Sequence, residues 1–219
     1  MQPPRKIITR SPHRRVGYVP CPWLQPSHIA YESLLECSFI RVALLCPSIQ
    51  SISHQPFRLD LGRLGTYTPD YLLACGSLQN LVVEVKPSTF VSRHREKLCA
   101  AQEVLQARGC DFLVSTEQEL CRDDRHDRAG QILRHARSLL STADVTRLLD
   151  GIRTVDFPIS AQALAIHLDV SLNQVMYLVG RRYLCVSPDL QISQLYNPKT
   201  KEKSNVDISI GAWLGRADW

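Results

Sequence analysis

Apolar residues in the first part of the chain switch between helical and strand-like spacing. A stripe that recurs every three or four residues runs through 33–45 and predicts a helix, which Pro47 would end. Short apolar runs follow, and they predict strands. Gly76 and Ser77 supply a turn that favours antiparallel pairing of the second and third runs. The expected strands cover residues 52–61, 67–74 and 81–85.

Alternating helices and strands are predicted up to about residue 140. Residues 92–108 place apolar side chains on one side of a helix, which Gly109 would end. The run DFLVS at 111–115 predicts a short buried strand, and residues 131–140 again have helical spacing. Helices that alternate with strands in this way predict the α/β class.

Beyond residue 140, short helices precede two strand-like runs. Ser160 and Ser171 are favourable N-terminal caps for two of these helices. Three helices followed by a β-hairpin is the element order of a winged helix, and the middle segment has helix-turn-helix spacing with Asp169 in its turn. A small helical packing module without a nucleic-acid role is the alternative. The helices are expected at 144–152, 161–167 and 172–182, and the hairpin at 183–195.

Length and composition agree with this division. With 219 residues, 44% of them hydrophobic, the chain can form one large domain or two modest ones. No apolar run approaches the roughly 20 residues that a membrane-spanning helix needs, so no membrane partner is expected. The expected parts are a basic arm at 1–30, an α/β domain at 31–140, and a winged-helix-like domain with a tail at 141–219.

The excess positive charge is concentrated in the arm. The chain has 26 basic and 21 acidic residues, and five of the basic residues, with no acidic one, lie within 1–31. Such an arm can follow DNA phosphates, with Arg14 and Arg15 as candidate contacts, or it can be a solubilising tail. Because the rest of the chain is balanced in charge, we expect weak DNA binding and poor cleavage by the protein alone.

Cysteine usage and the chain end add two expectations. The eight cysteines include no C-x-x-C pair, and residues 1–15 lack the apolar segment of a secretory signal. Reduced thiols in a cytoplasmic protein are therefore expected. Trp213, Leu214 and Trp219 follow a polar loop. Such a segment either packs on its own domain or anchors a partner, and the second alternative makes it a partner-docking tail.

The strongest chemical signal lies on two of the expected strands. Asp70 follows Pro69, and Glu84-x-Lys86 comes fourteen residues later inside an apolar run. Because side chains alternate along a strand, Glu84 and Lys86 project from one face. A neighbouring strand that carries Asp70 would bring two carboxylates together, and a divalent cation relieves their repulsion. These residues predict a metal-dependent phosphodiesterase site; a turn aspartate beside a surface salt bridge is the alternative.

This arrangement resembles the PD-(D/E)xK nucleases, with Asp70, Glu84 and Lys86 at the three motif positions. The resemblance implies a restriction-endonuclease-like mixed sheet flanked by helices, and two Mg²⁺ ions that Mn²⁺ can replace. Asp70 and Glu84 would bind metal together with the Val85 carbonyl, and Lys86 would position or help deprotonate the attacking water. The basic residues after the motif would contact DNA or form a solvated helix start; they are Arg93, Arg95 and Lys97.

A narrower resemblance covers residues 30–140, where YTPDYLL, LVVEVKP and DFLVSTEQEL look like the TnsA endonuclease subunit of heteromeric transposases. In that family a Ser-x-x-Glu helix precedes a Gln-Pro pair by about nineteen residues. Glu36 and Gln55 meet this spacing and Glu32 does not, so the resemblance implies that Glu36 is a further metal ligand and Gln55 a supporting residue. Ser33-x-x-Glu36 is also a capping box, and a purely structural role for Glu36 is the alternative.

The resemblance implies a Mg²⁺-dependent DNA endonuclease of cut-and-paste transposition in the bacterial cytosol. It would cut the 5′ strand at each transposon end, while TnsB, a DDE transposase, cuts the 3′ strand. TnsC, an AAA+ regulator, would be the second protein partner. Two other functions remain open, namely a stand-alone restriction or repair nuclease and a non-catalytic adaptor that binds DNA through the winged helix.

Overall fold

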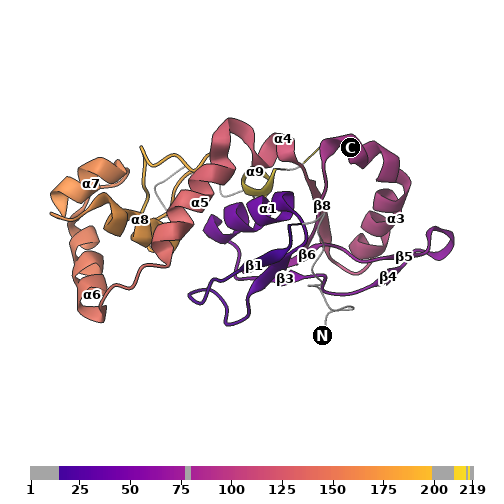
Figure 1. The fold of residues 1–219 in the computed structure, drawn as a ribbon, viewed down its shortest axis with the longest axis horizontal. Coiled ribbons are helices and arrows are strands. Elements are labelled where there is room, and N and C mark those ends of the chain that lie inside the picture. Colours follow the sequence, from indigo (N-terminus) through magenta and orange to yellow (C-terminus); the bar gives the residue numbers. More distant parts are fainter. Residues whose placement is uncertain (1–14, 77–79, 199–209, 216, 218–219) are drawn as a thin grey trace.

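A four-stranded mixed sheet forms the centre of the structure, a computed structural model that describes residues 15–76, 80–198, 210–215 and 217 (Figure 1). Its strand order is β3-β6-β7-β8. The first two pairs are antiparallel and the last pair, β7 with β8, is parallel. The bounds are β3 (Ser51–His54), β6 (Tyr71–Ala74), β7 (Leu81–Val85) and β8 (Asp111–Ser115). The predicted α/β class with a mixed sheet is confirmed.

Helices pack on both faces of the sheet because β7 is apolar on both sides. Val83 and Val85 belong to the same core cluster as α1 (Leu34–Leu45). Val82 belongs to a second cluster with Leu98 and other residues of α3 (Arg95–Gln106). The alternation of side chains along the strand therefore places α1 on one face and α3 on the other.

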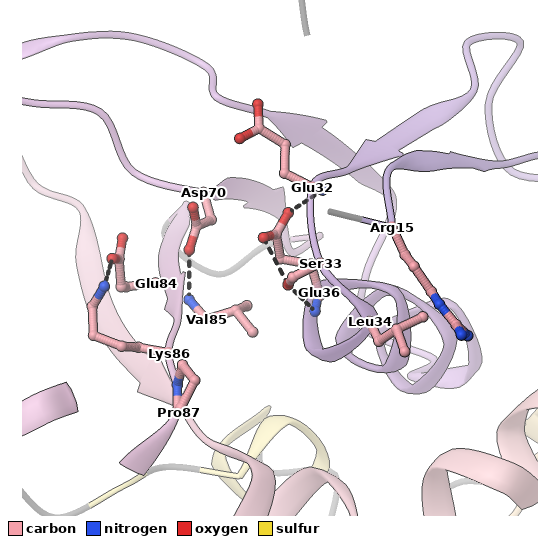
Figure 2. A pocket seen from close by; sticks show the side chains of 10 residues that line it. All are labelled: Arg15, Glu32, Ser33, Leu34, Glu36, Asp70, Glu84, Val85, Lys86 and Pro87. Atoms are coloured by element: carbon pink, nitrogen blue, oxygen red, sulfur yellow. Dashed lines mark hydrogen bonds and ion pairs between the residues drawn. The ribbon is translucent and has the colours of Figure 1, made fainter. Parts of the chain in front are cut away.

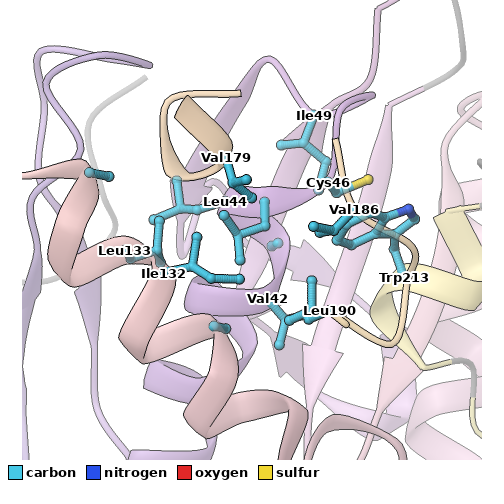
Figure 3. Packing of buried hydrophobic residues seen from close by; sticks show 14 of the residues in the cluster. Val42, Leu44, Cys46, Ile49, Ile132, Leu133, Val179, Val186, Leu190 and Trp213 are labelled. Atoms are coloured by element: carbon cyan, nitrogen blue, oxygen red, sulfur yellow. The ribbon is translucent and has the colours of Figure 1, made fainter. Parts of the chain in front are cut away.

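The helices of the C-terminal part extend the α1 side of the molecule. α5 (Arg125–Ala136) packs against both α1 and α8 (Leu172–Gly180), and one continuous core joins them (Figures 1 and 3). A Cβ on Gly180 would lie 2.6 Å from the Ala136 Cβ, so glycine allows the close approach of α8 to α5. The other helices are α2 (Ser88–Val91), α4 (Glu117–Leu120), α6 (Thr142–Gly151) and α7 (Ala161–His167).

The C-terminal segment lies against β8 and the start of α5. In α9 (Ile210–Leu214), Trp213 is 1% exposed and Leu214 is fully buried. Arg125 donates to the Trp213 carbonyl at 2.7 Å, and the Ala217 N–H donates to the Val114 carbonyl at 3.0 Å, beside the outer edge of β8. The prediction of a partner-docking tail is therefore wrong for Trp213 and Leu214, which are core residues. Trp219 lies outside the described residues.

The expected N-terminal arm is only partly separate from the fold. β1 (Gly17–Val19) pairs antiparallel with β2 (Ile29–Tyr31), and Val19, Cys21 and Ile29 are buried in the α1 core. The prediction of a free arm over 1–30 is wrong for this hairpin, because its few apolar residues are enough to fix it on α1. Arg14 lies outside the described residues.

Two predicted strands are broken by the residues around their prolines. The run 52–61 ends as β3 at residue 54, where Gln55 has a φ of 42° and Pro56 cannot donate to a ladder. The run 67–74 is divided at Pro69 into β5 and β6. The extra short pair consists of β4 (Leu59–Asp60) and β5 (Thr66–Tyr67), separated by a 3₁₀ turn at Gly62–Leu64.

Helix starts also differ from the prediction. α3 begins at residue 95, after α2 and a 3₁₀ turn at Ser92–His94. α5 begins at residue 125, six residues before the predicted start, after a 3₁₀ turn at Arg122–Asp124. The predicted α3 therefore began three residues too early, and the apolar periodicity missed the polar first turns of α5.

The C-terminal helices match the prediction, but the hairpin of the expected wing does not form as two paired strands. Residues 161–167 are helical as predicted, and α6 and α8 lie within two residues of their predicted bounds. In the hairpin region, isolated bridges join Ile159 to Leu195 and Cys185 to Tyr196. Arg122 and Arg128 bind Asp189, which holds the intervening loop on the start of α5 instead.

Among the described residues, no single helix has the length and apolar character to cross a bilayer, and α7 and α8 meet that criterion only together, across a bend of 116°.

Candidate active site

A pocket of about 580 Å³ opens where the sheet meets the start of α1 (Figure 2). It collects residues from the N-terminal hairpin, from α1 and from the ends of β6 and β7. All four predicted catalytic residues line it. The lining residues are Arg15, Glu32, Ser33, Leu34, Glu36, Asp70, Glu84, Val85, Lys86 and Pro87.

Strand register places Asp70 beside Glu84. Tyr71 pairs with Val83 across the antiparallel β6–β7 ladder, so Asp70, one residue before β6, lies level with Glu84. The Val85 N–H donates to Asp70 Oδ2 at 2.8 Å. Burial, and then the charges of Glu84 and Glu36, hold the pKa of Asp70 well above its usual range. The fold thus forces together carboxylates that repel one another.

Glu84 is held by one donor on each carboxylate oxygen. Lys86 Nζ lies 2.8 Å from Oε1, and the Tyr67 hydroxyl donates to Oε2 at 2.6 Å. Glu84 is only 6% exposed, as expected for a residue of β7, which is buried along its whole length. The Glu84–Lys86 ion pair of the alternative interpretation therefore forms, but inside the pocket and not on a solvated surface.

Glu36 is both a helix-capping residue and a pocket residue. The Ser33 hydroxyl accepts from the Glu36 N–H at 3.1 Å and donates to Glu36 Oε1 at 2.9 Å. Oε2 accepts from the Glu32 N–H at 2.8 Å and from the Tyr71 hydroxyl at 3.3 Å, and His54 Nε2 lies 3.8 Å away. Burial alone would raise the pKa of Glu36, but His54 and these donors together lower it.

The other predicted site residues are distributed around the pocket. Gln55 is buried; its N–H donates to the Asp70 carbonyl at 2.8 Å, and its side chain reaches Glu32, not Glu36, at 3.4 Å. Arg15 is exposed at the pocket rim. The predicted DNA contacts after the motif are not lining residues: Arg93 and Arg95 are exposed, and Lys97 is half-buried.

Sequence reasoning missed the residues that hold the carboxylates. Tyr67 and Tyr71 bracket Asp70 in the run YTPDY, and each donates to a different carboxylate. A buried tyrosine usually finds a partner for its hydroxyl, so these two tyrosines beside an acidic motif were a usable signal. His54 is a further residue beside the carboxylates: its Nε2 lies 3.8 Å from Glu36 Oε2, and neither ring nitrogen has a hydrogen-bond partner among the described residues.

Comparison with known families agrees with this geometry. Residues 46–117 match the family model described as TnsA-like endonuclease N terminal. The match supports a TnsA-type endonuclease. It spans β3 to β8 and therefore includes Asp70, Glu84 and Lys86, whereas Glu36 precedes it. A search of curated proteins gives no match to the chain.

The donor set of this pocket suits a hard divalent cation. Mg²⁺ is usually held by one or two carboxylates and keeps several waters, and Asp70 and Glu84 line one pocket together with Val85, whose N–H donates to Asp70. Among the described residues, no three His, Cys, Asp or Glu side chains already converge as a metal cluster. The carboxylate oxygens of Glu36 and Glu84 are instead bound to donors of the protein itself.

The raised pKa of Asp70 predicts a pH-dependent cost in the metal-free protein. A carboxyl whose pKa is raised in the folded state contributes full stability only below its ordinary pKa of about 3.9, and loses it as the pH rises through the folded-state value. Asp70→Asn should therefore melt at a higher temperature than the wild type at pH 7 in chelator, by about 2–4 °C per kcal/mol of repulsion relieved. The difference between the two proteins should disappear near pH 4, as measured by thermal scans at both pH values. If the variant and the wild type melt at the same temperature at pH 7 as well, the pKa of Asp70 is not raised.

Proposed function

We propose that this protein is a divalent-metal-dependent DNA endonuclease of a cut-and-paste transposition system, and that it cleaves the 5′ strand at transposon ends. The observation that carries the proposal is the convergence of Asp70, Glu84 and Lys86 in one pocket, inside the segment that matches TnsA-like endonucleases. Mg²⁺ is the proposed cofactor, with Mn²⁺ as a substitute, and the bacterial cytosol is the proposed site of action.

Each pocket residue has a distinct proposed role. Asp70 and Glu84 would hold the cation, with the Val85 carbonyl as a third ligand, and Glu36 would hold a second ion or its water. The ions would supply charge stabilisation at the phosphate and a more acidic bound water. Lys86, already 2.8 Å from a Glu84 oxygen, would orient the attacking water or donate a hydrogen bond to a phosphate oxygen. Arg15, which lines the pocket, would bind a neighbouring backbone phosphate.

The C-terminal helices have the order of a winged helix, but their arginine side chains already contact other groups of the protein. Residues 141–198 contain four arginines and no lysine. Arg147 and Arg153 pair with acidic residues on the same helical turn, at 3.8 and 3.0 Å. Arg181 donates to the Ala136 carbonyl, and Arg182 donates to carbonyls after α1. We infer that these four arginines add little phosphate affinity. Three lysines, Lys199, Lys201 and Lys203, follow outside the described residues, and we propose that TnsB-type and TnsC-type partners hold the complex on DNA.

A strand-specific cleavage assay tests the proposed function. The full-length protein is incubated with end-labelled transposon-end DNA, with and without a TnsB-type transposase and a TnsC-type regulator, in Mg²⁺, Mn²⁺ or Ca²⁺. We expect 5′-strand cutting in Mg²⁺ and Mn²⁺ that depends on the partners, and DNA binding with little cutting in Ca²⁺. Efficient cutting of plain duplex by the protein alone would instead indicate a stand-alone nuclease, and no cutting in any mixture would indicate an adaptor.

The two acidic residues near the start of α1 are expected to differ in importance. Glu36→Gln should reduce cleavage about 10–100-fold, because it removes a charge that faces the carboxylate pair while glutamine keeps most of the capping contacts. Glu32→Gln should reduce it less than about threefold. Rates of both variants under single-turnover conditions check this prediction. The reverse ranking would show that Glu32, which also lines the pocket, is the ligand.

A further inference from the structure

Two tyrosines flank Asp70 in the sequence, and their hydroxyls contact the carboxylates of Glu84 and Glu36. The Tyr67 hydroxyl donates to Glu84 Oε2 at 2.6 Å. The Tyr71 hydroxyl is shared between the Ala30 carbonyl, at 3.0 Å, and Glu36 Oε2, at 3.3 Å. Both tyrosines are buried, at 8% and 0% exposed.

The two tyrosines are not equivalent. An O–H···O⁻ distance of 2.6 Å is in the range of a strong, charge-assisted hydrogen bond, whereas 3.3 Å is long for any hydroxyl donor. Glu36 keeps the Glu32 N–H and the Ser33 hydroxyl if Tyr71 loses its hydroxyl. Among the described residues, Tyr67 is the donor to Glu84 Oε2, while Lys86 pairs with Oε1.

Tyr67 is also well fixed in space. It lies on β5, whose ladder pairs Tyr67 with Leu59, and its ring belongs to the α3-side core cluster that contains Val82 and Val114. A short strand and a packed ring therefore aim the hydroxyl at β7. Removal of the hydroxyl alone would leave the ring packing intact and a buried carboxylate oxygen without its donor.

We propose that Tyr67 is a positioning residue that fixes the orientation of the Glu84 carboxylate, so that Oε1 is presented to the pocket. This inference rests on the proposed function, because it assigns Glu84 to cation binding. Without the Tyr67 hydroxyl, the carboxylate is free to turn about its terminal bond, and the pocket loses a preorganised ligand. Loss of a hydrogen-bond partner behind a metal ligand typically lowers metal affinity or activity about 10–100-fold.

The test compares Tyr67→Phe with a matched buried tyrosine outside the site. Tyr177 on α8 is 6% exposed, close to the 8% of Tyr67, and its ring faces Arg181 away from the pocket, so Tyr177→Phe controls for the loss of a hydroxyl from a buried tyrosine. Mn²⁺ binding to each full-length variant is measured by electron paramagnetic resonance without DNA, and cleavage is measured in parallel. We expect Tyr67→Phe to weaken Mn²⁺ binding about 10–100-fold and Tyr177→Phe to leave it unchanged.

A double substitution separates positioning from a general structural effect. In a Glu84→Gln background, Tyr67→Phe should cause no further loss of Mn²⁺ affinity, because the carboxylate that it positions is already gone. Wild-type Mn²⁺ affinity and cleavage in Tyr67→Phe, with Asp70→Ala inactive, would overturn the role of Tyr67 and leave the proposed function standing. Full cleavage by Asp70→Ala would overturn the proposed function itself.

Discussion

Replacement of Asp70 by alanine is expected to lower the rate of strand cleavage about a thousandfold or more, which corresponds to about 4 kcal/mol of activation free energy. Asp70 lies level with Glu84 in the β6–β7 ladder and lines the same pocket as Glu36 and Lys86. No other carboxylate of the described pocket is placed between Glu36 and Glu84, so a neighbour is not expected to replace it. Its loss should remove the centre of the proposed metal site.

The variant should remain folded, because it removes one of the carboxylates that repel one another in the metal-free state. Circular dichroism and thermal melting check the fold, and single-turnover cleavage checks the activity. Asp111→Ala is a suitable control, because Asp111 is an exposed aspartate at the start of β8 and does not line the pocket. Wild-type cleavage by a folded Asp70→Ala protein would show that the site is wrongly assigned.

The site could be predicted from the sequence because it depends on local rules. Side-chain alternation puts Glu84 and Lys86 on one face of β7 wherever that strand lies. β6 and β7 follow each other along the chain and pair antiparallel, and their register puts Asp70 level with Glu84. Ser33 and Glu36 are related by a capping pattern that holds within one helical turn. None of these relationships needs knowledge of distant contacts.

The parts that could not be predicted depend on residues far apart in the sequence. Arg125 meets the Trp213 carbonyl 88 residues later, and the Ser115 hydroxyl donates to the Leu214 carbonyl 99 residues later, at 2.5 Å. Periodicity contains no information about such pairs. The N-terminal hairpin shows the same limit, since its three-residue strands are too short for an alternating pattern and are fixed only by packing on α1.

The Tyr67–Glu84 contact is an intermediate case. The tyrosine was visible beside the motif, but its partner depends on the extra pair β4–β5, which no apolar pattern indicated because Pro69 interrupts the run. The residues that bear charge were thus predictable from their chemistry, whereas the residue that orients one of them required the fold.

Trp213→Ala is expected to lower the free energy of unfolding by about 3–5 kcal/mol, the usual cost of removing a large buried aromatic side chain. Trp213 is among the largest fully buried side chains of the described residues, and it packs with Cys46, Val186 and Leu190 in the core shared by α1 and α5 (Figure 3). Its carbonyl also accepts a hydrogen bond from Arg125, which is buried, and a buried charge is destabilising when it loses a hydrogen-bond partner. Displacement of α9 would therefore cost both packing and a charged hydrogen bond.

Urea unfolding of the full-length protein measures this loss, and Phe90→Ala is the control because Phe90 is 43% exposed on α2. The control should lose less than about 1 kcal/mol, since nearly half of the Phe90 surface is already in contact with water. Deletion of residues 208–219 should be at least as damaging as Trp213→Ala, because it also removes the buried Leu214 side chain and uncovers the edge of β8. A deletion variant that keeps wild-type stability but no longer cuts in the presence of its partners would contradict the core role of the segment and restore the interpretation of a docking tail.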